Sequence, residues 1–201
     1  ELFDALPVHL VGRASDPHGD EDTLVEWYVT RTADGSFTLE VGAPSSPELA
    51  RHLEWLGVQP GFGCRQELSL AAPTLAGALA AKLGRGYLLT IDYGYESAEL
   101  YASWRREGTL MAFRNHAPQA DPLTLPGLTD LTAHVDLGAL ARTLIDKGLT
   151  VAATATQAES LLALGLGEVL ATARKRMSTD IASYARERRA AETLVDPAGL
   201  G

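Results

Sequence analysis

Cysteine and long apolar runs are both scarce in this sequence of 201 residues. Cys64 is the single cysteine, which excludes an intramolecular disulfide and a multi-cysteine zinc site within one chain. The longest apolar runs, such as Tyr87 to Ile91 and Leu161 to Leu166, fall far short of the roughly 20 residues that a membrane-spanning helix needs. We therefore expect a reducing compartment and no membrane span.

Positive charge is scarce as well, because 26 acidic residues outnumber 17 lysines and arginines and leave a net charge of -9. A net-acidic domain repels phosphate backbones, so we do not expect nucleic acid as a partner. A basic cluster near the end of the chain is interleaved with acids, which predicts a solvated helix face rather than a binding patch. Its members are Arg174, Lys175, Arg176, Arg186, Arg188 and Arg189.

Several common site motifs are absent: the sequence has no phosphate-binding P-loop, no G-x-S-x-G nucleophile turn and no H-E-x-x-H zinc pair. The glycine pairs at 61–63 and 84–86 lack the spacing and the following helix of a dinucleotide loop, and they predict turns. Asp130, His134 and Asp136 lie close in sequence, but strand-like residues separate them. We expect no metal site.

The first half of the chain predicts an antiparallel hairpin insertion at about residues 22–42. Apolar residues alternate over Leu24 to Thr32 and over Phe37 to Val41, and Asp34-Gly35 between them is a strong hairpin-turn signal. The next segments predict a helix from Pro47 to Gly57 that Ser46 caps, a strand over 64–70 and a helix over 73–84.

An almost unbroken apolar run from Gly86 to Gly94 contains Asp92 near its end. Apolar character on both faces predicts a central parallel strand that helices cover on each side. Ligands of open α/β sheets bind at the carboxyl ends of such strands, which makes Asp92 a candidate site residue. The alternative is a turn-forming aspartate.

Residues 95–135 have weak periodicity, and we expect a lid-like connection there. The following segments predict a helix over 137–147 capped by Asp136, a strand over 149–154, a helix opened by a Thr156–Glu159 capping box, and a helix from Ser178 to Ala191. This alternation predicts an α/β fold with an incomplete sheet, an added antiparallel hairpin and a helical carboxyl terminus.

Glu1 and Asp4 are three residues apart, and a helical turn over Glu1 to Leu6 would place both carboxylates on one face. Two such carboxylates suit a guanidinium or an amine, which they would bind by charge-assisted hydrogen bonds and orient for reaction. The alternative is that the acids stabilise a helix start through the helix dipole.

Four strings occur together in one order: Glu1 to His9, Asp92 to Tyr95, Arg106 to Leu110 followed by His116, and Pro126 to Asp136. With them the chain resembles the MidA family of class I S-adenosylmethionine-dependent methyltransferases. Mitochondrial members of that family act as arginine methyltransferases in the assembly of respiratory complex I. The resemblance covers residues 1–170 and leaves 171–201 as a terminal helix and tail.

The resemblance implies a partial Rossmann-like methyltransferase sheet, because the family's cofactor-binding half precedes the string that begins at Glu1. S-adenosylmethionine would then be bound mainly by residues absent from this chain. Glu1 and Asp4 match the acidic loop beside the methyl donor and are the expected catalytic residues. The expected substrate-binding residues are Glu67, Asp92, Tyr93 and His134. The role of the string from Asp130 to Asp136 stays open.

The expected function is methylation of an arginine on a protein substrate, in the bacterial cytoplasm or, in a eukaryote, the mitochondrial matrix. Two alternatives are a non-catalytic protein-binding or assembly module and a small-molecule methyltransferase. The isolated chain is expected to be inactive. A homodimer is a further open alternative.

Overall fold

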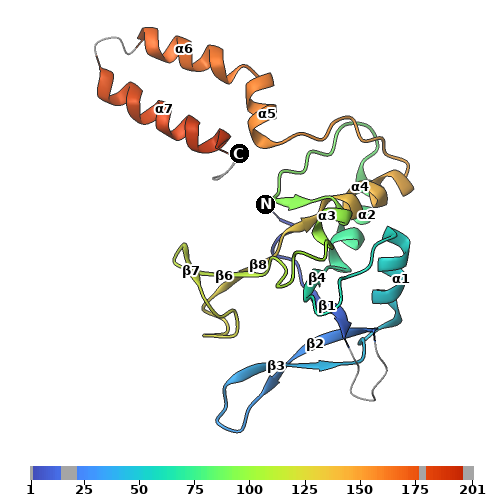
Figure 1. Cartoon of the computed structure of the whole chain (residues 1–201). Coiled ribbons are helices and arrows are strands. Elements are labelled where there is room, and N and C mark those ends of the chain that lie inside the picture. Colours follow the sequence, from blue (N-terminus) through green and yellow to red (C-terminus); the bar gives the residue numbers. More distant parts are fainter. Residues whose placement is uncertain (1, 15–21, 177–179, 197–201) are drawn as a thin grey trace. The chain divides into compact units, whose positions relative to one another are not determined.

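The structure, a computed structural model, describes residues 2–14, 22–176 and 180–196 (Figure 1). The chain divides into two compact units, Glu1–Thr150 and Val151–Gly201. The larger unit is a mixed α/β fold, and the smaller unit is helical. The predicted α/β class is confirmed at this level.

A four-stranded antiparallel sheet forms one part of the larger unit, with the order β3-β2-β1-β4. Its strands are β1 (His9–Ala14), β2 (Thr23–Arg31), β3 (Phe37–Gly42) and β4 (Gln66–Leu68). The predicted hairpin is confirmed as β2–β3, in which Trp27 pairs with Val41 and Val29 with Leu39. Gly35 closes the turn at a φ of 88°, which glycine adopts without steric cost.

Helix α1 (Pro47–Leu56) packs its apolar face against this sheet. Ser46 caps the helix by accepting a hydrogen bond from the Glu48 N–H (3.1 Å), and Gly57 ends it in the left-handed conformation. Both predicted ends of α1 are confirmed. Leu49 and Leu53 join Val11 and Leu68 of the sheet in one core.

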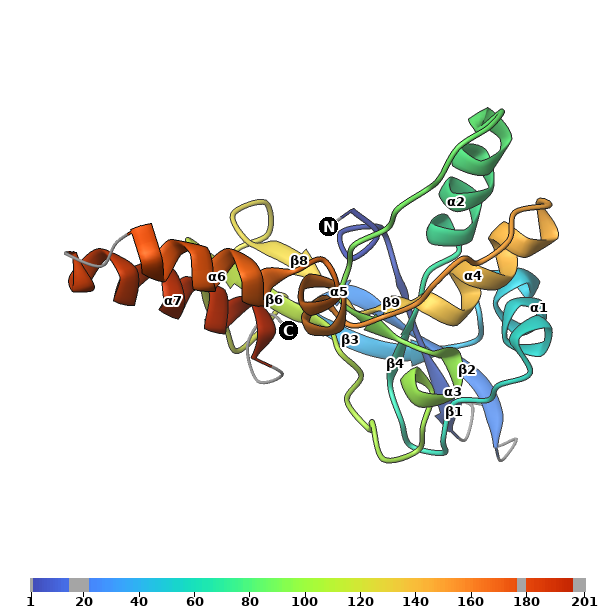
Figure 2. The ribbon, with the colours of Figure 1, turned by 90° about the horizontal axis from the view of Figure 1, so that it is seen from above.

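A second core lies between α2 (Ala71–Lys82) and α4 (Leu137–Asp146), which run side by side in Figure 2. Phe3 and Val135 are buried in the same cluster. Asp136 caps α4 by accepting from the Ala139 N–H (2.8 Å), as its sequence position predicts. Helix α2 begins two residues before the predicted Pro73.

The predicted central strand from Gly86 to Gly94 is wrong for this structure. Only β5 (Gly94–Tyr95) is paired, in parallel with β9 (Val135–Asp136). The preceding residues are extended but have no ladder partner within the described part of the chain. The predicted strand over 149–154 is also wrong for this structure, because those residues form no strand.

The predicted lid-like connection contains a small sheet that the sequence pattern did not reveal. Helix α3 (Ser97–Leu100) precedes it, and its strands are β6 (Met111–Arg114), β7 (Ala117–Gln119) and β8 (Asp130–Thr132), in the order β7-β6-β8. Strands of three or four residues are too short to show a clear alternation of apolar and polar residues.

The smaller unit consists of α5 (Gln157–Ala163), α6 (Leu166–Arg176) and α7 (Ile181–Val195). The Thr156–Glu159 capping box of α5 is confirmed. The cap of α7 is Asp180, which accepts from the Ser183 N–H (3.0 Å), so Ser178 was the wrong choice and itself lies outside the described residues. The helix also runs beyond Ala191.

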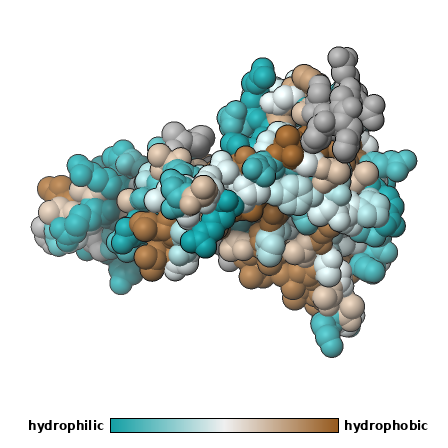
Figure 3. All heavy atoms as spheres, turned by 90° about the horizontal axis from the view of Figure 1, so that it is seen from below, coloured by the Kyte–Doolittle hydropathy of each residue, from teal (hydrophilic) through white to brown (hydrophobic). Residues whose placement is uncertain are grey.

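The six basic residues of α6 and α7 are all exposed, as a solvated face requires, and the choice between such a face and a binding patch stays a prediction. None of the described helices is long and apolar enough to cross a membrane. Large apolar side chains nevertheless reach the surface, and hydrophobic residues appear as brown patches in Figure 3.

Candidate functional site

The turn that leads into β1 is held in place by Asp92. The Asp92 Oδ2 atom accepts hydrogen bonds from the backbone N–H groups of Leu2 (3.0 Å) and Phe3 (2.9 Å). A further bond from the Leu6 N–H to the Phe3 carbonyl closes the turn (3.2 Å). Residues 3–6 thus form a turn rather than the expected helix, and Phe3 anchors it in the core.

Asp4 lies in this turn and is almost fully buried, with 7% of its surface exposed. Its Oδ2 atom accepts a hydrogen bond from the Tyr93 hydroxyl (2.8 Å). Its backbone carbonyl accepts from the Ala133 N–H (3.0 Å). A side-chain bond and a backbone bond from two distant segments therefore fix the position of the Asp4 carboxylate.

An aromatic wall, made of Tyr93, Tyr95 and His134, stands beside Asp4. The His134 ring stacks on Tyr95 (centroids 5.2 Å apart) and meets Tyr93 edge to face (5.4 Å). The Arg105 guanidinium lies 3.9 Å from the centre of the Tyr95 ring. Burial, and secondly the charge of Arg105, lower the pKa of His134 below its ordinary value, which favours the neutral form of its ring.

Glu67 of β4 is buried behind the wall and accepts three hydrogen bonds. Its Oε2 accepts from the Thr109 N–H (2.8 Å) and hydroxyl (2.9 Å), and its Oε1 accepts from the Leu110 N–H (3.1 Å). Burial raises the pKa of Glu67, although these hydrogen bonds act in the opposite direction. Thr109 Oγ1 in turn accepts from the His134 N–H (3.0 Å).

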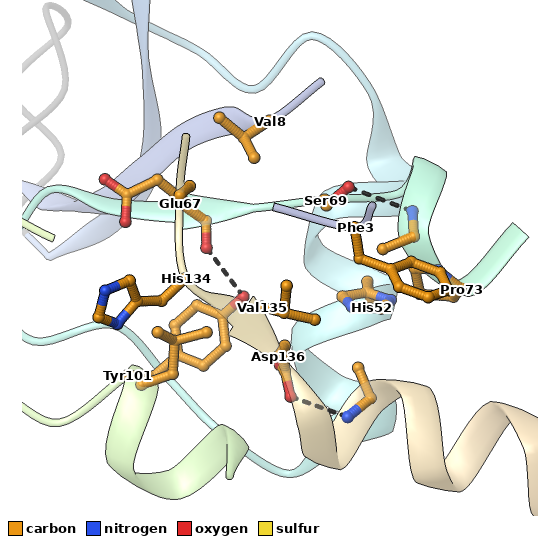
Figure 4. Close-up of a pocket in the computed structure, with 14 residues that line it drawn as sticks. Phe3, Val8, His52, Glu67, Ser69, Pro73, Tyr101, His134, Val135 and Asp136 are labelled. Atoms are coloured by element: carbon orange, nitrogen blue, oxygen red, sulfur yellow. Dashed lines mark hydrogen bonds between the residues drawn. The ribbon is translucent and has the colours of Figure 1, made fainter. Parts of the chain in front are cut away.

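A small cavity of about 20 Å³ lies between Glu67, Asp136 and the second core. Figure 4 shows Phe3, Tyr101 and Val135 among its lining residues, and the Tyr101 hydroxyl donates to the Glu67 carbonyl (3.2 Å). This space is about what one water molecule requires, so it cannot contain a nucleoside. Within the described residues, His134 Nδ1 and Asp136 Oδ2 are buried without a hydrogen-bond partner.

The structure brings five of the six predicted site residues into one connected group: Asp4, Glu67, Asp92, Tyr93 and His134. The sixth, Glu1, lies outside the described residues. The catalytic and substrate-binding roles that the sequence assigned to them stay predictions. Over the described residues, no group of three or more histidine, cysteine or acidic side chains is arranged to hold a metal ion.

Sequence reasoning missed three residues that support this group. Thr109 lies within a string that carried the family resemblance but received no role, while Tyr95 and Arg105 were not considered as site residues. Tyr95 is the last residue of the Asp92 to Tyr95 string, which is a signal that could have identified it. The Arg105 guanidinium lies over the Tyr95 ring, and no sequence spacing predicts such a contact.

Comparison with known proteins identifies similar sequences and structures. Residues 1–155 match a family described as "Putative S-adenosyl-L-methionine-dependent methyltransferase". The chain is 29% identical over 174 residues to the mitochondrial protein arginine methyltransferase NDUFAF7 homolog of Caenorhabditis elegans, a match that covers 83% of this chain and 36% of the relative.

Two crystal structures from Burkholderia thailandensis are also similar, each with a TM-score of 0.84, 31% sequence identity and coverage of 100% of this chain. One is described as a "likely methyl transferase" bound to S-adenosyl-homocysteine, and this chain covers 49% of it. The other is a native structure, of which this chain covers 50%. The chain therefore spans half or less of the length of these relatives.

Proposed function

The chain belongs to this family of S-adenosyl-L-methionine-dependent methyltransferases, and we propose that it supplies the acceptor side of an enzyme that methylates a protein arginine. The worm relative is named as a protein arginine methyltransferase, which supports arginine as the acceptor. The bound S-adenosyl-homocysteine of the bacterial relative supports S-adenosylmethionine as the methyl donor.

One observation carries the proposal: Asp4 is a buried carboxylate whose direction is fixed by Tyr93 beside an aromatic wall. A guanidinium is planar and cationic, so a carboxylate binds it by charge-assisted hydrogen bonds while a ring face attracts its charge. The Arg105 guanidinium already lies over the Tyr95 ring, and a neutral His134 adds no second positive charge there. Buried carboxylate and aromatic rings together therefore match an arginine side chain better than a neutral acceptor.

The reaction needs a nucleophilic nitrogen held in line with the methyl group. S-adenosylmethionine, when bound, supplies that methyl group in electrophilic form. We infer that Asp4 accepts hydrogen bonds from the guanidinium, orients one nitrogen and stabilises the charge on it. The nitrogen would form a bond to the methyl carbon as the carbon–sulfur bond breaks, S-adenosyl-homocysteine would be the leaving group, and one proton would pass from the nitrogen to solvent.

The residues present fit the reacting end of this chemistry but not the adenosine. The cavity beside Asp136 is too small, and the sequence lacks a glycine-rich loop followed by a helix. The chain also covers only about half of the relative that contains S-adenosyl-homocysteine. We therefore propose that residues outside this chain bind most of the cofactor.

The proposal is tested with the natural protein that contains this chain, by supplying methyl-labelled S-adenosylmethionine and cell protein. Acid hydrolysis of the labelled product should release the label as methylated arginine. Label found only in small molecules would overturn the protein substrate, and label in another amino acid would overturn the arginine. If no label is transferred to any acceptor, the chain is better explained as a protein-binding module.

A further inference from the structure

We propose that a clamp formed by Glu67, Gly108, Thr109 and Leu110 positions Asp4 for the reaction, and that Thr109 is its central positioning residue. The catalytic meaning of the clamp rests on the proposed function, whereas its effect on Asp4 is a property of the folded chain. Neither Glu67 nor Thr109 needs to touch the substrate in this account. Both act through Ala133 and His134, mainly by way of Tyr93.

The clamp joins two segments that are 42 residues apart in the sequence. Three hydrogen bonds from Thr109 and Leu110 converge on the Glu67 carboxylate, at 2.8, 2.9 and 3.1 Å. In Figure 4 this carboxylate points away from Phe3 and Asp136, on the side of the cavity where His134 lies. A buried carboxylate that already accepts three hydrogen bonds is suited to hold a loop rather than to bind a substrate.

Gly108 makes the close approach possible. Its φ of 70° lies in the left-handed region, which glycine adopts at little cost. A Cβ atom at this position would overlap both carboxylate oxygens of Glu67 and approach the Arg65 carbonyl to 2.8 Å. The loop can therefore close on Glu67 only with glycine at position 108.

Thr109 transmits this anchor to the aromatic wall. Its hydroxyl donates to Glu67 and accepts from the His134 N–H (3.0 Å), so it uses both hydrogen-bonding capacities. The His134 ring packs against Tyr93, whose hydroxyl donates to Asp4. The neighbouring Ala133 N–H donates to the Asp4 carbonyl, so the strand segment that Thr109 anchors contacts Asp4 directly as well.

This connection matters because methyl transfer depends on alignment. A displacement of about 1 Å at a reacting group can reduce a rate by about 100-fold. Loss of the Thr109 hydroxyl would free the His134 backbone and the ring packed on Tyr93. The Asp4 carboxylate would then lose its single preferred direction without losing its charge.

The test compares Thr109→Val with Thr109→Ser in the natural protein. Valine preserves the shape and removes the hydroxyl, whereas serine keeps the hydroxyl. Thr129→Val is the matched control, because the Thr129 hydroxyl bonds only to the carbonyls of Thr124 and Leu125 in the loop before β8. The variants are compared by NMR without substrate and by methyl-transfer kinetics.

In the NMR measurement, Thr109→Val should speed amide exchange at His134 and shift the Asp4 carboxyl and Tyr93 ring resonances. Thr109→Ser and Thr129→Val should leave them in place. Unchanged Asp4 and Tyr93 resonances in Thr109→Val would overturn the clamp. This readout needs no turnover, so it decides the clamp even if the proposed methyl transfer fails.

In the kinetic measurement, Thr109→Val should lower kcat by about 10-fold with little change in the acceptor KM, and serine should restore kcat to within about 2-fold. In a Tyr93→Phe background, Thr109→Val should lower kcat by less than about 3-fold, because Thr109 acts on Asp4 through Tyr93. Independent, multiplicative losses would show that Thr109 does not act through Tyr93 and would overturn the proposal.

Discussion

The aromatic wall and the apolar segment 86–91 that precedes it in the chain are built in opposite ways. Rings and hydrogen bonds from four segments hold Tyr93, Tyr95 and His134 beside Asp4. By contrast, Tyr87, Leu89 and Ile91 are 91%, 80% and 62% exposed and lie outside any described strand. Within the described residues, the chain holds the Asp4 group in place by its own contacts, whereas the apolar segment before it is left outside any strand.

The difference shows which part of a methyltransferase this chain can organise alone. Both partners of Asp4 named above, Tyr93 and Ala133, belong to this chain, so the chain fixes the position of Asp4 by itself. The apolar segment has side chains suited to burial on both faces, and the described residues do not bury Tyr87, Leu89 or Ile91. We infer that it becomes a central strand when the rest of the domain is present.

The largest expected contrast is in cofactor binding. This chain alone should show no binding of S-adenosylmethionine by calorimetry, whereas the natural protein that contains it should bind at least ~100-fold more tightly, a difference of about 2.7 kcal/mol. The reason is that the cavity beside Asp136 is too small for adenosine, and this chain covers only about half of the relative that contains S-adenosyl-homocysteine. Micromolar binding by the chain alone would contradict the proposal that residues outside this chain bind most of the cofactor.

The next largest effect is on the free energy of unfolding, through the contact between Gly108 and Glu67. Gly108→Ala should lower the free energy of unfolding by about 2–4 kcal/mol, through left-handed strain and loss of the Glu67 hydrogen bonds. Gly127→Ala is the control, since its φ of 80° is similar but no atom lies within 4 Å of the added Cβ. It should cost about 1 kcal/mol. Equal losses in urea denaturation would mean that the Glu67 contact is unimportant.

A smaller effect should separate the chain alone from the natural protein. Ile91→Ser should change the stability of this chain by less than about 0.5 kcal/mol, because Ile91 is exposed. In the natural protein, burial of the segment should raise the loss to about 1.5–3 kcal/mol. Val29→Ser is the control, because Val29 is exposed to a similar 57%. It should change the free energy of unfolding little in either protein. A small loss at Ile91 in both proteins would refute the central strand.

The smallest effect is on the pH dependence of stability. The pKa of His134 is lowered from 6.5 by burial and by Arg105, so the unfolded chain binds this proton more readily than the folded chain. The free energy of unfolding should therefore decrease as pH falls from 6.5 through the lowered folded pKa. Tyr93, Tyr95 and Arg105 are the groups that face the ring.

Urea denaturation of the wild type and of His134→Gln at pH values above and below 6.5 checks this expectation. The variant should lose less stability at the acidic pH, because its side chain cannot titrate. His52, whose pKa is also lowered by burial, contributes equally to both proteins. An identical pH dependence in the two would show that His134 does not titrate differently on folding.

Local sequence signals predicted the local structure well. Ser46, Asp136 and the Thr156–Glu159 box cap helices as their spacing indicates, because each cap depends only on neighbours within three residues. The β2–β3 hairpin formed for the same reason, since four residues separate its strands in the predicted pattern.

The signals failed where a structure depends on distant partners. The run from Gly86 has the composition of a buried strand but finds no neighbour in the described chain. Grouping Asp4 with Tyr93 and His134 required the family resemblance, because 89 residues separate the two ends of the Asp4–Tyr93 hydrogen bond. Thr109 acts through contacts to Glu67 and His134 that no sequence period encodes.

The most direct test of the central claim is methyl transfer by the Asp4→Ala variant of the natural protein, measured together with its cofactor affinity. We predict a loss of roughly 100-fold or more in kcat with unchanged binding of S-adenosylmethionine. Asp121→Ala is the control, because the carboxylate of Asp121 bonds only to its own exposed loop, and its turnover should not change. Unchanged turnover in Asp4→Ala would remove Asp4 from the reaction and contradict the account.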